Sequence, residues 1–278
     1  MSWAVRWRLA VLLSILFVMV AGYLAAIQDP LVRRADVALP DWPAGAAPVT
    51  IALIGDTHMS DPDMTPARLA RLVGRVNALS PDIILVAGDF ISDKSTSTRR
   101  YTPAEAIAPL GALRTPLGVY AVLGNHDGFQ RAETEAALTA AKITLLANSV
   151  IRAGPVLIAG FGDFLWGEAQ PALVEAALVG QSGPVVAFAH SPDIAPQLRG
   201  RLRLLLAAHT HCGQVRLPWA GALKTASIHG QRYGCGVIRE GRRTVIVTAG
   251  LGTSRFPIRI GAPPDLWLVT VGPGVSRR

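Results

Sequence analysis

Residues 49–58 of the chain read VTIALIGDTH, an apolar run that ends abruptly in glycine, aspartate and histidine. The run Val49–Ile54 is rich in β-branched and large apolar side chains and predicts a buried strand, which Gly55-Asp56 terminates. In the extended segment that follows, Asp56 and His58 are two positions apart and therefore point to the same face. The stretch predicts a strand that delivers two potential metal ligands to one side of a sheet.

The same pattern, a short apolar strand followed at once by a polar residue, occurs repeatedly along the chain. Four further predicted strands have it: Ile83–Ala87 before Gly88-Asp89, Val119–Leu123 before Gly124-Asn125-His126, Val185–Ala189 before His190, and Leu202–Ala208 before His209-Thr210-His211. Open α/β sheets carry their sites at the carboxyl ends of strands, so these side chains are expected to meet. Five of the six histidines of the chain lie at such strand ends.

The remaining pattern alternates strands with helices and predicts an α/β layered fold. Helices are expected at 65–79, where Thr65-Pro66 supplies a cap and a first-turn proline, and at 103–113, 132–142 and 169–179. Further strands are expected at Val156–Ala159, Gly236–Arg239, Thr244–Thr248 and Leu266–Val271.

The strand-end residues offer carboxylate, imidazole and amide donors without a thiolate, a set that suits Mn²⁺, Fe, Zn²⁺ or Co²⁺. Seven such ligands exceed what one tetrahedral ion needs, and one shared carboxylate would serve a pair of ions. A pair of divalent ions can lower the pKa of a bridging water and clamp phosphoryl oxygens, so that the bridging hydroxide attacks phosphorus. We therefore expect two divalent metal ions, with manganese as the metal for activity in vitro.

These residues also carry a resemblance to a known family. The series Gly55-Asp56-Thr57-His58, Gly88-Asp89, Gly124-Asn125-His126-Asp127, His190 and His209-Thr210-His211 resembles the calcineurin-like metallophosphoesterase superfamily over roughly residues 49–271. The stretches 189–193, 211–218 and 250–259 resemble a narrower branch of bacterial membrane-tethered or exported phosphodiesterases, some of which are UDP-2,3-diacylglucosamine pyrophosphatases. The resemblance implies a four-layer α/β/β/α sandwich with two metal ions between the sheet ends.

The resemblance also assigns a role to each site residue. It implies that one metal is held by Asp56, His58 and His211, the other by Asn125, His190 and His209, and that Asp89 bridges them. His126 would contact the phosphoryl oxygen or protonate the leaving group, and Asp127 would orient its imidazole through a hydrogen bond. The chain departs from the family pattern at Ala208 and Cys212, where glycine is usual; neither change removes a ligand.

The resulting functional hypothesis is a metal-dependent phosphoric ester hydrolase that cleaves a phosphodiester or pyrophosphate bond. Its substrate would be a lipid-linked or cell-envelope molecule such as UDP-2,3-diacylglucosamine. Two alternatives stay open from the residues alone: a phosphomonoesterase, and a non-catalytic metal-binding envelope protein. The net charge of +8 forms no long basic run interleaved with aromatic residues, so no nucleic-acid partner is expected.

The chain of 278 residues divides into three expected parts: an N-terminal helix at 1–28, a Pro/Ala-rich extended linker at 29–48 and a catalytic domain at 49–278. The apolar run Leu9–Ile27 of about 19 residues is long enough to cross a bilayer, and Trp3 and Trp7 precede it as interfacial residues do. It predicts a single-pass anchor in a bacterial inner membrane, with a cleaved signal peptide as the alternative. Arg6 and Arg8 favour a catalytic domain outside the cytoplasm, whereas Arg33-Arg34 oppose them and leave the cytoplasmic face open.

Several other features have ordinary explanations as well as functional ones. Cys212 is either a small buried residue or the partner of Cys235 in a disulfide formed outside the cytoplasm, and His229 is expected to be structural. Asp61 and Asp63 are expected in a turn and not in a third metal site, and Ser95–Arg100 in an exposed loop. A group of apolar residues either packs in the ordinary way or lines an acyl-chain groove: Phe161, Phe164, Leu165 and Trp166, with Pro218-Trp219.

Overall fold

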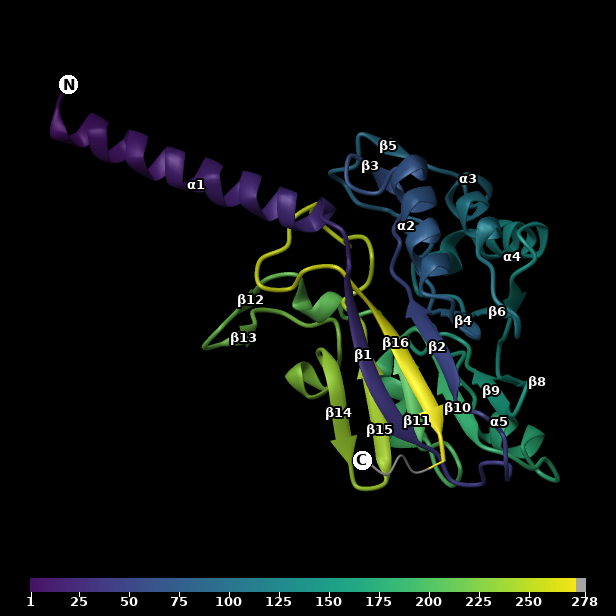
Figure 1. Cartoon of the computed structure of the whole chain (residues 1–278). Coiled ribbons are helices and arrows are strands. Elements are labelled where there is room, and N and C mark those ends of the chain that lie inside the picture. Colours follow the sequence, from purple (N-terminus) through teal and green to yellow (C-terminus); the bar gives the residue numbers. More distant parts are fainter. Residues whose placement is uncertain (274–278) are drawn as a thin grey trace.

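The computed structural model describes residues 1–273 and has two six-stranded sheets packed face to face (Figure 1). In spatial order, the first sheet is β1 (Leu31–Ala38), β16 (Asp265–Gly272), β2 (Val49–Ile54), β4 (Ile83–Val86), β6 (Val119–Ala121) and β7 (Thr144–Leu145). The second is β14 (Gly236–Glu240), β15 (Arg243–Val247), β11 (Leu204–Ala207), β10 (Val185–Phe188), β9 (Val156–Gly160) and β8 (Ser149–Ala153).

The helices are α1 (Trp3–Ile27), α2 (Pro66–Ala78), α3 (Pro103–Ile107), α4 (Arg131–Ala140) and α5 (Pro171–Ala177). Two small ribbons complete the fold, β3 (Ser60–Asp61) with β5 (Arg99–Arg100) and β12 (Arg216–Leu217) with β13 (Gly221–Ala222).

Parallel pairing brings the strand ends of each sheet to one edge. In the first sheet β2, β4, β6 and β7 run parallel. In the second sheet β9, β10, β11 and β15 run parallel, and the two outer strands β8 and β14 are antiparallel to their neighbours. The residues that follow β2, β4, β6, β10 and β11 can therefore meet where the two sheets adjoin.

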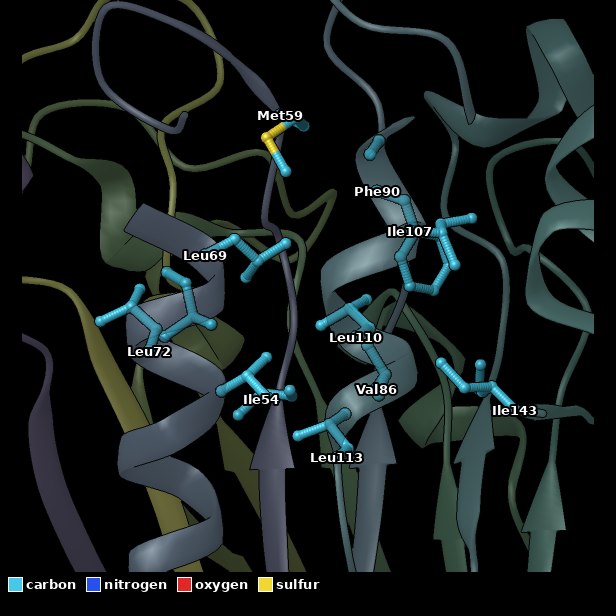
Figure 2. Close-up of a cluster of buried hydrophobic side chains, with 14 of the residues drawn as sticks. Ile54, Met59, Leu69, Leu72, Val86, Phe90, Ile107, Leu110, Leu113 and Ile143 are labelled. Atoms are coloured by element: carbon cyan, nitrogen blue, oxygen red, sulfur yellow. The ribbon is translucent and has the colours of Figure 1, made fainter. Parts of the chain in front are cut away.

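The central strands are buried on both faces, and alternate residues serve different cores. In β2, Ile51 and Leu53 point into the core between the two sheets, whereas Ala52 and Ile54 point toward the helices. On the helical side, Leu69 and Leu72 of α2 pack against Ile54 and Val86 (Figure 2). The outer face of the second sheet packs against Val174 of α5 and a 3₁₀ turn at Pro192–Gln197. The four-layer α/β/β/α sandwich predicted from the sequence is confirmed.

Residues 31–38, expected as part of an extended linker, instead form strand β1. All eight residues of β1 are in register with β16 in a parallel pair, and Ala35 and Val37 pack against the core between the sheets. Arg33 reaches the fully buried Asp265, with Nε 2.6 Å from Oδ2. Because the polar residues of this segment lie on an edge strand, its sequence lacks the continuous apolar character that marked the inner strands.

Two helices are much shorter than the sequence pattern indicated. The predicted helix at 103–113 is an α-helix only to Ile107 and continues as a 3₁₀ turn at Ala108–Ala112, where Pro109 cannot donate a helical hydrogen bond. The predicted helix at 169–179 spans only Pro171–Ala177. Neither difference moves a strand end.

A test of the helical layer compares two leucines of different burial. Leu69 is fully buried between α2 and the first sheet, whereas Leu173 of α5 is half exposed. We expect Leu69→Ala to lower the free energy of unfolding by about 2–5 kcal/mol and Leu173→Ala by less than about 0.5 kcal/mol, as measured by denaturant titration in detergent. Equal effects of the two substitutions would contradict the described packing.

Candidate metal centre

The loops after five strands of the two sheets converge at one edge of the sandwich. The residues predicted from the sequence lie on them: Asp56 and His58 follow β2, Asp89 follows β4, Asn125 and His126 follow β6, His190 follows β10, and His209 and His211 follow β11. Among the residues described, three groups of acidic and imidazole side chains offer donor atoms within 4.8 Å of one another: Asp56, His58 and His211; Asp89, His190 and His209; and His58, Asp89 and His126. The structure thus brings together side chains that lie up to 155 positions apart along the chain.

The backbone at these strand ends is unusual. Five of the seven candidate ligands have a left-handed backbone, with φ between 42° and 70°: Asp56, His58, Asp89, His209 and His211. Residues other than glycine adopt this region infrequently, although asparagine, aspartate and histidine do so more often than the rest, and such residues cluster at functional sites. The sharp turns aim successive side chains back toward the edge at which the strands end.

Asp89 lies at the middle of the cluster. Its Oδ2 atom is 3.4 Å from Nε2 of His58 and 3.3 Å from Nε2 of His190, so one carboxylate oxygen faces both imidazoles. Its Oδ1 atom accepts a hydrogen bond of 2.9 Å from the backbone N–H of His126. A Cβ at Gly124 would collide with the same carboxylate and with the Asp89 backbone, so glycine is required there. Asp89 is placed to be shared between two ions.

The first candidate site comprises Asp56, His58 and His211. The Nε2 atoms of the two histidines are 3.0 Å apart, and Nε2 of His211 is 3.9 Å from Oδ2 of Asp56. Burial lowers the pKa of both His58 and His211 well below the ordinary value, so both rings are neutral. Neutral imidazole is the form that binds a metal ion.

The second candidate site comprises His190, His209 and Asn125. Nε2 of His190 lies 3.1 Å from Nδ1 of His209 and 3.2 Å from Oδ1 of Asn125. On the other side of the ring, Nδ1 of His190 is 2.7 Å from the carbonyl oxygen of Ala87, which aims Nε2 at the cluster. Burial disfavours a charge on His190, but the carboxylates of Asp89 and Asp56 outweigh it and raise its pKa to about 10. A divalent cation would compete with that proton for Nε2 of His190.

The donor set fits a pair of divalent ions. Each group presents oxygen and imidazole nitrogen donors without sulfur, the combination expected for Mn²⁺, Fe, Zn²⁺ or Co²⁺. The two sites are joined through Asp89, as a dinuclear centre requires.

Asp127 does not contact the imidazole of His126, contrary to the role expected from the resemblance. Its buried carboxylate accepts hydrogen bonds from four backbone N–H groups: those of Asp89 at 2.8 Å, Phe90 at 2.8 Å, Gly124 at 2.9 Å and Ile91 at 3.4 Å. It thereby joins the loop after β4 to the loop after β6. Its effect on the site is to hold the backbone that presents Asp89.

His126 faces a different carboxylate. Its Nδ1 atom is 2.8 Å from Oδ1 of Asp93, although no hydrogen bond joins the two atoms. Its Nε2 atom is 3.9 Å from Oδ2 of Asp89, and the ring meets that of His58 edge to face. Asp93 is exposed and was not singled out in the sequence, because it belongs to no strand-end motif.

Arg259 is a fully buried side chain whose role the sequence did not reveal. Its guanidinium donates to the carbonyl oxygens of Ala249 and Gly252 at 2.6 Å and of Ala262 at 2.9 Å. One of its nitrogens lies 3.4 Å from Nδ1 of His211. Arg259 therefore holds the loop after β15 next to the candidate ligand His211.

Asp63 belongs to a second buried polar contact near the site. Residues 60–64 form a turn as expected, and the carboxylate of Asp63 accepts hydrogen bonds from Nζ of Lys94 at 2.6 and 2.8 Å and from the hydroxyl of Thr253 at 2.6 Å. The Asp63 carboxylate is thus paired with a lysine, and Asp61 accepts a hydrogen bond from the hydroxyl of Tyr101.

The structure also shows where the other residues discussed in the sequence analysis lie. Cys212 and Cys235 form a disulfide, the alternative that the sequence left open. The ring of His229 meets that of Tyr233 edge to face, and His229 belongs to none of the three donor groups. Of the aromatic residues considered for an acyl-chain groove, Phe161 is buried in the core of the second sheet, whereas the indole of Trp166 donates a hydrogen bond to the carbonyl of Asn125.

A cavity of about 1010 Å³ opens over the cluster. Its floor includes Asp89, Asn125, His126, His209 and His211. Lys94, Lys224 and Arg255 place positive charge in its walls, and Phe129, Leu165 and Phe256 make other parts of the walls apolar. A mixed wall of this kind suits an anionic group that carries an apolar substituent.

Comparisons with known proteins agree with this centre. A family model described as calcineurin-like phosphoesterase matches residues 49–213. The chain is 30% identical over 240 residues to the uncharacterized metallophosphoesterase YkuE of Bacillus subtilis (strain 168), covering 82% of this chain and 81% of that protein. It is 28% identical to phosphodiesterase YaeI of Escherichia coli (strain K12), covering 81% and 82%. A transmembrane protein with metallophosphoesterase domain from Danio rerio is 30% identical, and the match covers 89% of this chain but 58% of that protein.

Fold and site together define a dinuclear metallohydrolase of the α/β/β/α type. The chain belongs to the calcineurin-like phosphoesterase family. It is a metal-dependent phosphoester hydrolase of a family that works with two metal ions. The N-terminal helix Trp3–Ile27 is long and apolar enough to cross a membrane, and it agrees with membrane anchoring in the transmembrane relatives.

The hydrogen bonds of Asp127 allow a test between two roles: holding the backbone around Asp89, or orienting the imidazole of His126. We expect Asp127→Ala to lower the free energy of unfolding by about 3 kcal/mol and to reduce bound metal, because four backbone N–H groups lose their acceptor and Asp89 shifts. Asp93→Ala, which removes an exposed carboxylate, should change stability by less than about 0.5 kcal/mol. Denaturant titration and elemental analysis measure both effects. An Asp127→Ala variant with unchanged stability and metal content but slow turnover would support a role on His126 instead.

Proposed function

We propose that the chain is a membrane-anchored phosphodiesterase that cleaves a phosphodiester or pyrophosphate bond in the cavity over the metal centre. The single observation that carries this proposal is the position of Asp89, whose one carboxylate oxygen faces ligands of both candidate sites. The cavity of about 1010 Å³ offers room for both substituents of a diester, and the relative YaeI is named a phosphodiesterase.

We assign Asp56, His58 and His211 to one divalent ion, Asn125, His190 and His209 to the other, and Asp89 to both. When bound, such a pair lowers the pKa of a water molecule and polarises the phosphoryl oxygens. Manganese is the metal we expect to support activity in vitro, with iron, zinc and cobalt as alternatives.

His126 is the residue we propose for the leaving group. It lines the cavity beside the ligands without belonging to either assigned set, and its Nε2 atom faces the centre. Hydrolysis joins a water oxygen to phosphorus and breaks the bond from phosphorus to the leaving oxygen. A proton must reach that oxygen, and the Nε2–H of a protonated His126 is placed to supply it, while Asp93 faces the opposite ring nitrogen.

We further propose that α1 stays attached as an anchor in a bacterial inner membrane and that the catalytic domain lies outside the cytoplasm. The disulfide between Cys212 and Cys235 supports this location, because disulfides persist in oxidising compartments. A lipid-linked or cell-envelope phosphodiester would be within reach of such an enzyme. UDP-2,3-diacylglucosamine is a substrate of that class, and its hydrolysis would place the domain on the cytoplasmic face instead.

The test compares His126→Ala with His229→Ala, a histidine that lies outside the centre. With Mn²⁺ and an aryl phosphodiester, we expect His126→Ala to keep its metal by elemental analysis and to lose about 10²–10⁴-fold in rate, whereas His229→Ala keeps its rate. EDTA should abolish turnover in all variants.

Four outcomes would overturn parts of the proposal. Unchanged turnover in His126→Ala would remove the assigned role of His126, and loss of metal would make His126 a ligand. Faster hydrolysis of an aryl phosphomonoester than of the diester would identify a phosphomonoesterase. A wild-type protein that holds both metals but cleaves neither ester would be a non-catalytic metal-binding protein.

A further inference from the structure

The last turn of α1 is packed against the catalytic domain. Gly22 and Ala26 are its buried residues, and the carbonyl oxygen of Gly22 accepts a hydrogen bond of 2.9 Å from the backbone N–H of Arg259. The side chain of Ile258 lies so close to Gly22 that a Cβ would collide with it. From the other side, the guanidinium of Arg68 donates to the carbonyl oxygen of Ala26 at 3.1 Å. The domain therefore sits directly at the end of the membrane helix.

The length of the apolar run sets the depth of that contact. Leu9–Ile27 is about 28 Å long as a helix, and the hydrocarbon core of a bilayer is about 30 Å thick. The whole run is thus needed to cross the bilayer, so the membrane-spanning part of α1 includes the residues that contact the domain. It follows that the domain surface around Ile258 lies at the membrane surface.

Two segments extend this surface, and both carry exposed apolar side chains. They are the hairpin Arg216–Leu223, with Trp219 at its tip 83% exposed, and the loop Ser254–Ile258, with Phe256 56% exposed. The amide of Gln214, before the hairpin, donates hydrogen bonds of 3.0 Å to the carbonyl oxygens of Phe256 and Ile258, which ties the two segments together. Figure 1 shows the β12–β13 hairpin projecting from the same side of the domain as α1.

The loop 254–258 and the residues on either side of the hairpin line the cavity over the metal centre. Gln214, Val215 and Lys224 line it from the hairpin side, and Arg255, Phe256 and Ile258 line it from the loop. Lys224 and Arg255 add positive charge beside the apolar side chains, a combination that favours an anionic membrane surface.

We propose that the tip of the hairpin and the loop 254–258 form a second contact with the membrane, and that the cavity takes phosphodiesters whose remaining ester arm is a lipid held in that bilayer. This assignment of the substrate class rests on the phosphodiesterase activity proposed above. The membrane contact itself rests only on the geometry of α1 and the two segments.

The first part of the test measures the membrane contact. The full-length protein, with either Trp219→Cys or Val179→Cys, is labelled with an environment-sensitive fluorophore and reconstituted in nanodiscs that contain anionic lipid. Val179 is a matched control, because it is 80% exposed and follows α5, at the opposite end of the domain from α1 (Figure 1). The native cysteines are paired in the disulfide, so the new thiol takes the label. Lipids with a spin label near the headgroup should quench the fluorophore at 219 and leave the one at 179 unchanged.

The second part measures the substrate class with two matched probes in the same nanodiscs. One is a long-alkyl p-nitrophenyl phosphodiester that inserts in the bilayer, and the other is its methyl counterpart, which stays in solution. In both, water adds to phosphorus, nitrophenolate leaves and the alkyl phosphate remains. We expect the wild type to favour the long-alkyl probe, and Trp219→Ser to lower its turnover about tenfold without changing that of the methyl probe. Val179→Ser should affect neither probe.

The measurements distinguish a failure of the proposed membrane contact from a failure of the proposed phosphodiesterase activity. Equal quenching at 219 and 179, with the two probes cleaved equally well, would overturn the inference and leave the phosphodiesterase proposal intact. Quenching at 219 alone with cleavage of neither probe would keep the membrane contact and overturn the phosphodiesterase. A loss of methyl-probe turnover in Trp219→Ser would show that the hairpin serves the centre itself and would contradict the proposed role.

Discussion

The structure depends on the Asp89 carboxylate, which is buried at the junction of two sheets and faced by imidazoles from both. A carboxylate in such a place is stable only if opposite charge and hydrogen-bond donors surround it. His190 supplies attraction from the second sheet, so that its proximity and that of neighbouring imidazoles hold the pKa of Asp89 well below its usual range against the effect of burial. The parallel strands, the left-handed turns at their ends and the glycine at 124 all serve to bring these groups to one point.

Two residues, Arg259 and Arg68, make hydrogen bonds both to the membrane helix α1 and to the region around the metal centre. Arg259 donates its backbone N–H to α1 and its guanidinium to the loop behind His211. Arg68 of α2 binds both the end of α1 and the carbonyl of Asp63, which is paired with Lys94 in the wall of the cavity. The catalytic domain is consequently fixed in orientation relative to the helix, and its cavity faces one defined direction with respect to the bilayer.

The sequence predicted the inner strands and the site better than the edges of the fold. Strands such as Val49–Ile54 are buried on both faces and read as unbroken apolar runs, and the ligands follow them directly. Strand β1 carries Arg33, Arg34 and Asp36, and its pairing with β16 leaves no signal in its own sequence. The hydrogen-bond partners of Asp127 and Arg259 could not be predicted either, because hydrogen bonds with distant backbone groups depend on the tertiary fold alone.

The central claim is that two divalent ions share Asp89, and the number and magnetic coupling of bound Mn²⁺ ions test it most directly. Apo protein in detergent is titrated with Mn²⁺ and followed by electron paramagnetic resonance and elemental analysis. We expect two ions per chain with the spectrum of a coupled pair in the wild type, and at most one uncoupled ion in Asp89→Ala. A single uncoupled ion in the wild type, or a coupled pair that survives in Asp89→Ala, would contradict it.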